Sequence, residues 1–227
     1  MKTQAIIPSA GSGIRLKSKV LKPFVSIGGK PLIFYTLKAF EKSSKVESVI
    51  LVVPQDKLTG FKKLVKSFKI KKVKEIVSGG KTRKDSVANG IACLDKDTKM
   101  VVVHDGARPA ITPKLIDLSV ETCKRYRAVI VAVPVKPTIK RVDPGSMEVE
   151  ATLQRDKLWE AQTPQTFHRD ILEKAHREIK DGNPTDDSYL IEQMGLKVKI
   201  IKGDYRNIKV TTPEDLIIAR GLLCNTK

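Results

Sequence analysis

Short apolar runs, rich in β-branched residues, recur along the first two thirds of the chain. They occupy residues 5–7, 49–53, 73–77, 100–103 and 129–133. Between them lie segments whose apolar residues have helical spacing, at about residues 31–42, 57–68, 83–94 and 112–126. Strands that are apolar on both faces and alternate with amphipathic helices are typical of a mostly parallel sheet covered on both sides. The pattern predicts an α/β fold of the Rossmann-like, doubly wound type.

The pattern changes between residues 134 and 159. Polar and β-branched residues alternate there around the turn signal Asp143-Pro144-Gly145-Ser146, which predicts a β-hairpin arm that protrudes from the domain. A two-stranded hairpin has no core of its own and is marginal in isolation. Because packing against a second copy of the chain would stabilise the arm, we expect a homodimer.

The last third of the chain returns to helices and a strand. Helices are predicted near residues 168–180 and 186–193, and a strand at residues 198–201. A final helix is expected to open at Thr212 and Pro213, because threonine is a good N-cap and proline suits the first helical position. The 227 residues fit one domain, residues 1–227, with the arm as an excursion.

The first predicted strand runs into the segment PSAGSGIRL, residues 8–16, and Lys22 follows. Gly11 and Gly13 allow backbone N–H groups to converge on phosphate oxygens, and Arg15 and Lys22 add cationic side chains. Leu16 stands where the dinucleotide fingerprint has its third glycine, and no G-K-[ST] closes a P-loop. The segment therefore predicts phosphate binding and disfavours nicotinamide or flavin cofactors.

Two further loops follow the ends of predicted strands. Gly79 and Gly80 precede Ser86, whose hydroxyl suits a base or ribose, although such a glycine pair is often a plain strand-to-helix turn. The segment HDGARP, residues 104–109, ends a fully apolar strand, where open α/β sheets bind ligands. Asp105 suits Mg²⁺ or a substrate hydroxyl, with a buried turn-capping aspartate as the alternative, and Arg108 suits an anion. His104 is expected to be a hydrogen-bonded residue near the core, not a metal ligand.

The net charge of +18 raises the possibility of a basic nucleic-acid-binding module. The most basic stretch, residues 57–84, has apolar residues at helical spacing, which favours an amphipathic helix with a solvated lysine face. A nucleic-acid function also leaves the glycine loops unexplained, and 5% aromatic residues offer few stacking platforms. We therefore expect no nucleic-acid partner, and a basic field that attracts small phosphorylated substrates.

Cellular location follows from absences in the sequence. No apolar run approaches the roughly 20 residues that cross a bilayer, and the N-terminal apolar stretch is too short for a signal peptide. Cys93, Cys123 and Cys224 lie far apart without C-x-x-C spacing, so neither a disulfide framework nor a zinc cluster is indicated. We expect a cytoplasmic protein without a membrane partner.

Seven segments together resemble one enzyme family. They are PSAGSGIRL with Lys22, SGGKTRKDSV, HDGARP, VPVKPTIKRV, LQRDKLWEAQTPQTF, the TDD of residues 185–187, and NIKVTTPEDL. In order and spacing they are similar to the 2-C-methyl-D-erythritol 4-phosphate cytidylyltransferases of the non-mevalonate isoprenoid pathway, across nearly the whole chain. The resemblance implies a fold of the nucleotide-diphospho-sugar transferase type, CTP as co-substrate, methylerythritol phosphate as acceptor, Mg²⁺ as cofactor and a homodimer that exchanges its arms.

The resemblance also implies roles for individual residues. Arg15 and Lys22 would stabilise the charged transition state, and Arg155 and Lys209 would position the acceptor. Contacts to the nucleotide would come from Ala10, Gly11, Gly13, Gly79, Gly80 and Ser86. The acceptor side would be lined by Asp105, Arg108, Thr138 and Thr163, and Asp105 would also bind the metal. The pair Lys22-Pro23, where the family usually has Lys-Gln, is similar to broader sugar-phosphate nucleotidyltransferases. Cytidylyl transfer to another polyol phosphate, such as ribitol 5-phosphate, is therefore the nearest alternative.

Overall fold

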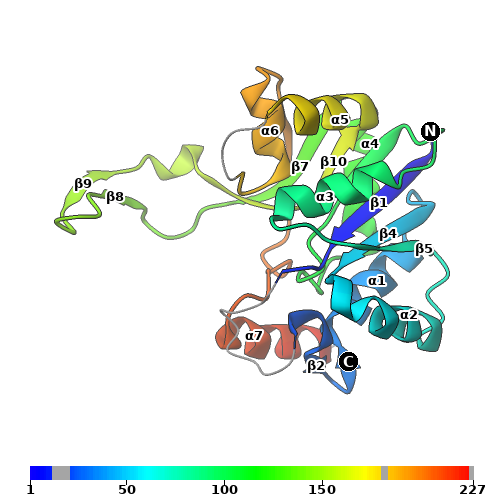
Figure 1. The fold of residues 1–227 in the computed structure, drawn as a ribbon. Helices are drawn as coiled ribbons and strands as arrows, with labels where there is room; N and C mark the ends of the chain where they lie inside the picture. The colour runs from blue at the N-terminus through cyan, green and yellow to red at the C-terminus, as the bar shows by residue number, and fades with distance from the viewer. Residues whose placement is uncertain (12–20, 180–183, 225–227) are drawn as a thin grey trace.

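A seven-stranded sheet forms the centre of the protein in the computed structural model, which describes residues 1–11, 21–179 and 184–224 (Figure 1). The strand order is β11-β7-β10-β6-β1-β4-β5, and every neighbouring pair is parallel except those that involve β10. The strands are β1 (Thr3–Pro8), β4 (Ser48–Val53), β5 (Val73–Ser78), β6 (Met100–Val103), β7 (Ala128–Pro134), β10 (Trp159–His168) and β11 (Lys199–Lys202).

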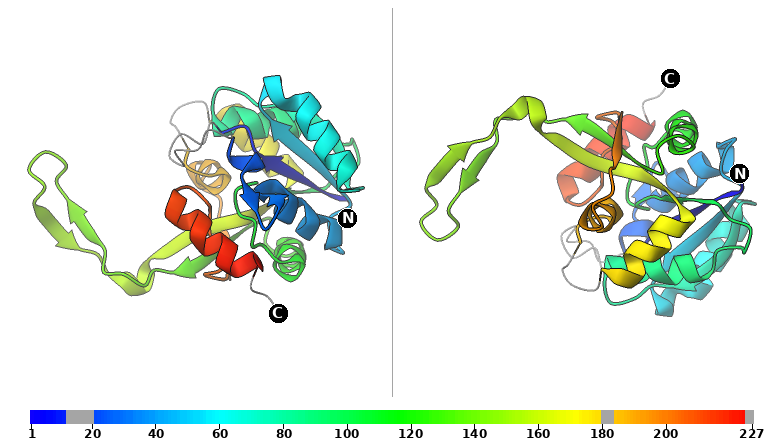
Figure 2. Two further views of the ribbon diagram at one scale, coloured as in Figure 1. Left: turned by 90° about the horizontal axis from the view of Figure 1, so that it is seen from below. Right: turned by 90° about the horizontal axis from the view of Figure 1, so that it is seen from above.

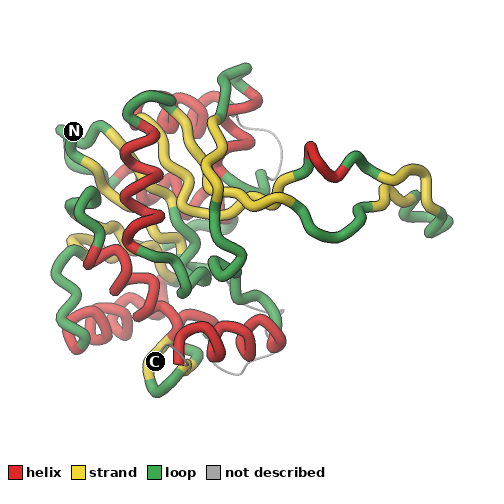
Figure 3. Tube along the Cα trace, turned by 180° about the vertical axis from the view of Figure 1, so that it is seen from behind, coloured by secondary structure: helices red, strands yellow, loops and turns green. Residues whose placement is uncertain are grey.

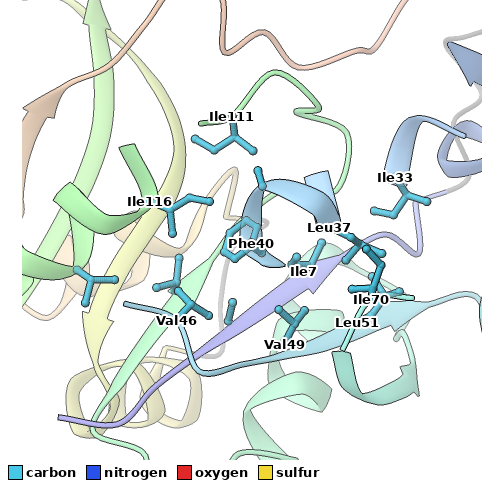
Figure 4. Close-up of a cluster of buried hydrophobic side chains, with 14 of the residues drawn as sticks. Ile7, Ile33, Leu37, Phe40, Val46, Val49, Leu51, Ile70, Ile111 and Ile116 are labelled. Carbon is cyan, nitrogen blue, oxygen red and sulfur yellow. The ribbon is translucent and has the colours of Figure 1, made fainter. Parts of the chain in front are cut away.

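Helices cover both faces of this sheet (Figure 2). One face carries α1 (Leu32–Lys42), α2 (Leu58–Ser67) and α4 (Pro113–Cys123), and the other carries α3 (Arg83–Ala92), α5 (Arg169–Glu178) and α6 (Asp187–Gln193). Alternate residues of β1 enter different cores: Ala5 and Ile7 pack on the first face and Ile6 on the second. Figure 4 shows Ile7 among side chains of α1, around Phe40. The predicted doubly wound, mostly parallel sheet is therefore confirmed.

The interior strand β10 was not predicted from the sequence. It runs antiparallel between β6 and β7, and its pairing with β7 shifts register between Ala161 and Gln165. Its buried residues include Gln162, Thr163 and Gln165, and such polar side chains hide the signal of a buried strand. The sheet is therefore mixed at its middle and parallel on either side.

A hairpin arm projects from the body of the protein, as predicted (Figures 1 and 3). It consists of β8 (Lys140–Val142) and β9 (Val149–Thr152), which pair antiparallel, and of a 3₁₀ turn at Arg155–Lys157. Asp143 closes the turn by accepting hydrogen bonds from the backbone N–H groups of Gly145 and Ser146, at 3.0 and 2.7 Å. The paired strands are shorter than the 134–159 segment, whose ends belong to β7 and β10.

The C-terminal helix α7 (Pro213–Cys224) begins at the predicted proline. Thr212 Oγ1 accepts a hydrogen bond from the Asp215 N–H at 3.4 Å. The helix packs against the short hairpin of β2 (Ser26–Ile27) and β3 (Lys30–Pro31) through a small cluster that includes Ile27, Val210 and Ala219. This cluster fixes the segment before α7, which carries Lys209, at one end of the sheet.

The lysine-rich face of α2 is exposed, as the sequence predicts. In α2, Phe61 and Val65 are buried, whereas Lys62, Lys63 and Lys66 are exposed. The three cysteines are free. Within the described part of the chain, no helix is long and apolar enough to cross a membrane.

Candidate active site

A pocket of about 810 Å³ opens at the carboxyl ends of β1, β5 and β6. The loops that follow these three strands build most of its wall, and segments from distant parts of the chain complete it. The lining residues are Pro8, Ser9, Ala10, Gly11, Lys22, Pro23, Leu32, Gly80, Lys81, Thr82, Arg83, Ser86, Asp105, Gly106, Ala107, Pro184, Thr185 and Lys209. Carboxyl ends of parallel strands are the usual ligand-binding edge of such a sheet.

The pocket is cationic. Among its described lining residues, Lys22, Lys81, Arg83 and Lys209 are basic, and Asp105 is the only acidic residue. Backbone N–H groups of the loops add partial positive charge. The pocket is therefore suited to a ligand with several negative charges, such as a triphosphate.

The two glycine loops touch each other at one side of this pocket. A β-carbon at Gly79 would collide with the methyl group of Ala10 and lie 2.9 Å from Ser86 Oγ, so only glycine fits there. Ser86 Oγ accepts a hydrogen bond from the Gly80 N–H at 3.1 Å and donates to the Thr82 carbonyl at 2.9 Å. Thr82 and Asp85 form a capping box that starts α3. The loop shape is thus fixed before any ligand binds.

Three cationic side chains surround the carboxylate of Asp105. Lys209 Nζ is 2.8 Å from Oδ2, Arg83 Nε is 3.3 Å from Oδ1, and Arg108 Nε is 3.7 Å from Oδ2. Burial alone would raise the pKa of this carboxyl, but the three cations outweigh burial and hold it well below its ordinary value. Asp105 is therefore ionised at neutral pH.

Arg108 and Thr163 lie behind the pocket wall. Arg108 is 7% exposed and donates to the carbonyl groups of Asn207 and Ala161, at 2.8 and 3.4 Å. Thr163 Oγ1 accepts from the Asp105 N–H at 3.0 Å and contacts His104 Nδ1, also at 3.0 Å. Both residues support Asp105 from the protein side.

His104 is a buried, hydrogen-bonded histidine, as expected. Its Nε2 is 3.3 Å from the Arg108 carbonyl, which can only accept, so Nε2 carries the hydrogen and Nδ1 accepts from Thr163. Burial lowers the pKa of His104 to about 4. The imidazole is therefore neutral at neutral pH and holds the loop that carries Asp105.

Two of the other predicted site residues do not line this pocket. Arg155 and Thr138 lie on the arm, where both are exposed, and Arg155 Nη1 donates to the Lys136 carbonyl at 2.9 Å. Gly13 and Arg15 lie outside the described residues. The structure thus brings together Ala10, Gly11, Lys22, Gly79, Gly80, Ser86, Asp105 and Lys209.

Two residues that the sequence analysis did not assign extend the charged site inward. Asp187, 1% exposed, accepts from Arg83 Nη1 at 2.8 Å, and His176 Nε2 lies 3.1 Å from its other carboxylate oxygen. The TDD segment of residues 185–187 marked the region, because Thr185 lines the pocket. No local pattern marked His176, which is 11 residues from its partner.

The described residues of the pocket offer few ligands for Mg²⁺. Within the described residues, no group of three or more His, Cys, Asp or Glu side chains is placed to hold a metal ion. Asp105 is the single carboxylate among the described lining residues, and cations already surround it. The described side chains alone therefore do not build a metal site, and Mg²⁺ would also need oxygen ligands from a substrate and from water, as is usual for this ion.

A mostly parallel sheet with glycine loops and a cationic pocket at its carboxyl edge fits the nucleotidyltransferase class of enzyme. Comparison with known proteins specifies the family. The family model for "2-C-methyl-D-erythritol 4-phosphate cytidylyltransferase" matches residues 3–225, and the chain belongs to this family. It is a cytidylyltransferase.

Individual relatives agree over their full lengths. The chain is 44% identical over 231 residues to the 2-C-methyl-D-erythritol 4-phosphate cytidylyltransferase of Alkaliphilus metalliredigens, covering 100% of this chain and 95% of the relative. The crystal structure of the 4-diphosphocytidyl-2C-methyl-D-erythritol synthase of Anaerococcus prevotii superposes with a TM-score of 0.86 at 32% identity, covering 98% of each chain. The Francisella tularensis cytidylyltransferase superposes at 0.81 and 29% identity, covering 98% of this chain and 100% of that one.

Proposed function

We propose that this pocket transfers the cytidylyl group of CTP to 2-C-methyl-D-erythritol 4-phosphate. The products are 4-diphosphocytidyl-2-C-methyl-D-erythritol and pyrophosphate, and the reaction serves isoprenoid precursor synthesis by the non-mevalonate pathway. Membership of the cytidylyltransferase family is the observation that carries this conclusion. We propose that residues 1–227 form one nucleotidyltransferase domain with its arm, acting in the cytoplasm; the free cysteines agree with a reducing compartment.

The proposed chemistry is a single in-line displacement. A phosphate oxygen of the acceptor attacks the α-phosphorus of CTP, the bond from that phosphorus to the bridging oxygen breaks, and pyrophosphate leaves with the electron pair. The acceptor phosphate is already anionic at neutral pH, so the reaction needs no strong general base. Positioning and charge stabilisation carry the catalysis, which agrees with a pocket lined by lysines, arginine and glycine loops.

We assign the nucleotide to the side of the pocket formed by the glycine loops. Ala10, Gly11, Gly13, Gly79, Gly80 and Ser86 would contact the nucleotide. Lys22 and Arg15 would stabilise the charge that develops on the phosphates. The contact between Gly79 and Ala10 supports this assignment, because it places both loops at one side of the pocket.

The acceptor would lie on the side of Asp105 and Lys209. Asp105 is ionised, so it can accept a hydrogen bond from an acceptor hydroxyl, and Lys209 is 39% exposed beside it and can approach the acceptor phosphate. Arg108 and Thr163 would act through the loop that carries Asp105.

Arg155 and Thr138 would serve a second copy of the chain. Both lie on the arm and neither lines the pocket of their own chain; the arm projects from the body of the protein (Figure 1). Met147 is 75% exposed and Val149 is 59% exposed near the tip of the arm. A homodimer that exchanges arms would cover these apolar side chains and bring Arg155 to the partner's acceptor.

Mg²⁺ would come with the triphosphate. It usually keeps several waters and binds through one or two carboxylates together with substrate phosphates. Among the residues that the structure describes, the pocket lining has one carboxylate, Asp105, and no group of three or more metal-ligating side chains is present. The metal would neutralise charge on the leaving pyrophosphate, and the side chains of the pocket would hold the remaining phosphate oxygens.

Pyrophosphate release tests this function. Each of the four ribonucleoside triphosphates is supplied with methylerythritol phosphate, with ribitol 5-phosphate, or without an acceptor. We expect release only with CTP, and at least tenfold faster with methylerythritol phosphate than with ribitol 5-phosphate, a difference of about 1.4 kcal/mol. Equal rates with all triphosphates, or a preference for ribitol 5-phosphate, would refute the proposal.

A further inference from the structure

Four charged or polar side chains form an ion chain, which consists of His176, Asp187, Arg83 and Asp105. It runs from α5 through the first residue of α6 and the first turn of α3 to the end of β6. The links are His176 Nε2 to Asp187 Oδ1 at 3.1 Å, Arg83 Nη1 to Asp187 Oδ2 at 2.8 Å, and Arg83 Nε to Asp105 Oδ1 at 3.3 Å. One end of the ion chain therefore lies in the pocket, and the other lies where α5 contacts the start of α6, outside the pocket lining.

Asp187 has a fixed backbone and an ionised side chain. Gln165 Oε1 accepts from the Asp187 N–H at 3.1 Å, which ties the start of α6 to β10. Burial opposes ionisation of Asp187, but Arg83 and the hydrogen bond from His176 outweigh it and hold the pKa of Asp187 below its ordinary value. An ionised carboxylate can only accept, so His176 Nε2 carries the hydrogen and donates it. His176 thus selects the direction in which the Asp187 carboxylate points.

Arg83 receives its orientation from Asp187. Its guanidinium is planar, so fixing Nη1 on Asp187 also fixes Nε, which contacts Asp105. Within the described part of the chain, Arg83 Nη2 is buried without a hydrogen-bond partner, although Arg83 lines the pocket. A buried donor of this kind can donate to an ordered water or to a ligand oxygen that reaches it. Arg83 therefore belongs to the pocket, whereas Asp187 and His176 lie behind it.

We propose that His176 is a positioning residue: through Asp187 and Arg83 it fixes the carboxylate of Asp105 for the acceptor. The inference rests on the proposed function, which places Asp105 beside the acceptor. His176 is 5% exposed in its side chain and lines no part of the pocket, so it acts without touching a substrate. Its loss would affect use of the acceptor more than binding of CTP.

Two substitutions of His176 separate the hydrogen bond from the volume of the side chain. His176→Leu keeps the bulk and removes the donor, whereas His176→Gln can present an amide N–H close to the position of Nε2. We expect His176→Leu to lower kcat/KM for methylerythritol phosphate about tenfold or more, because a hydrogen bond to a charged group is lost. The KM for CTP should stay within about twofold, and His176→Gln should recover kcat/KM to within about threefold of wild type.

His168 provides a matched control. Its Nε2 lies 3.1 Å from the Cys123 carbonyl, so His168→Leu also removes a hydrogen bond of a half-buried histidine. His168 pairs with Met100 at the start of β6, whereas Asp105 follows the end of that strand. The control residue and the pocket therefore lie at opposite ends of β6. We expect wild-type kinetics for His168→Leu when every variant is assayed below its melting transition.

Asp187→Asn is a second test if His176→Leu does not fold. It keeps the size of the side chain and removes the charge that holds Arg83, and the same acceptor-selective loss is expected. Wild-type kcat/KM for the acceptor in either variant would overturn the inference. An equal loss of kcat/KM for CTP and for the acceptor in His176→Leu, which His176→Gln does not recover, would also overturn it. That result would indicate a structural role alone. An inactive wild-type protein would instead overturn the proposed function, and this inference with it.

Discussion

Replacing Lys209 by methionine removes the ammonium group that lies 2.8 Å from Asp105 Oδ2 and keeps most of the apolar stem. Coulomb's law gives about 1.5 kcal/mol for this separation in bulk water. The Lys209 side chain is 39% exposed, and solvent-exposed ion pairs contribute roughly 0.2–1 kcal/mol after screening and lost side-chain entropy. The expected loss of stability is therefore at most about 1 kcal/mol, or roughly 2–4 °C in Tm for a chain of this size.

The expected loss of activity is much larger. If Lys209 holds the acceptor phosphate during transfer, its removal should lower turnover on the order of 10²-fold, as for a preorganised oxyanion donor. The pKa of Asp105 rises in the variant, but Arg83 and Arg108 still keep this carboxylate ionised at neutral pH. The defect would therefore come from the missing cation and not from a protonated aspartate.

Pyrophosphate release and thermal melting measure the two effects separately. Lys45→Met is the matched control, because Lys45 forms an ion pair of the same 2.8 Å length with Glu121 and has a similar exposure, 42%. The control should lose a similar amount of stability and no activity. Turnover of Lys209→Met within about threefold of wild type would refute the assigned role, since a phosphate contact is worth far more.

Three further predictions concern other parts of the protein. Lys22→Ala should lower turnover on the order of 10²-fold, and wild-type pyrophosphate release by this variant would remove Lys22 from the phosphate site. Burial lowers the pKa of His104 from 6.5 to about 4, so the unfolded chain binds the proton more tightly, and stability present above pH 6.5 should be lost as the pH falls toward 4. Urea unfolding should show that the free energy of unfolding falls by up to about 3 kcal/mol over this pH range. A His104→Gln variant should not show this pH-dependent loss. Changing Met147 and Val149 together to glutamate should give monomers by light scattering that bind CTP without turnover; a monomeric wild type at micromolar concentration would contradict the exchanged-arm dimer.

The sequence predicts most of the parallel strands well, because buried parallel strands have continuous apolar runs such as residues 49–53 and 100–103. It does not reveal β10, whose segment carries Gln162, Thr163 and Gln165 and an internal proline. These polar groups are buried because the tertiary structure supplies partners: Gln165 bonds to the start of α6, and Gln162 donates to the Asp204 carbonyl at 3.0 Å. Local patterns contain no information about such partners.

The candidate site, like the fold, could be predicted only in part from the sequence. The strand-end loops predicted a shared edge, and Gly11, Gly80, Asp105 and Lys209 do line one pocket. The ion pair of Arg83 with Asp187 joins residues 104 positions apart, so spacing in the sequence could not indicate it. The arm residue Arg155 is a different case, because its proposed role requires a second chain.

A crystal structure of the protein with bound CTP tests most directly whether the pocket at the carboxyl edge of the sheet holds the nucleotide. We predict the triphosphate between the first glycine loop and Lys22, and the cytosine near Gly80 and Ser86, with Asp105 and Lys209 left for the acceptor. Nucleotide bound elsewhere, for example on the exposed lysines of α2, with this pocket empty, would contradict the account.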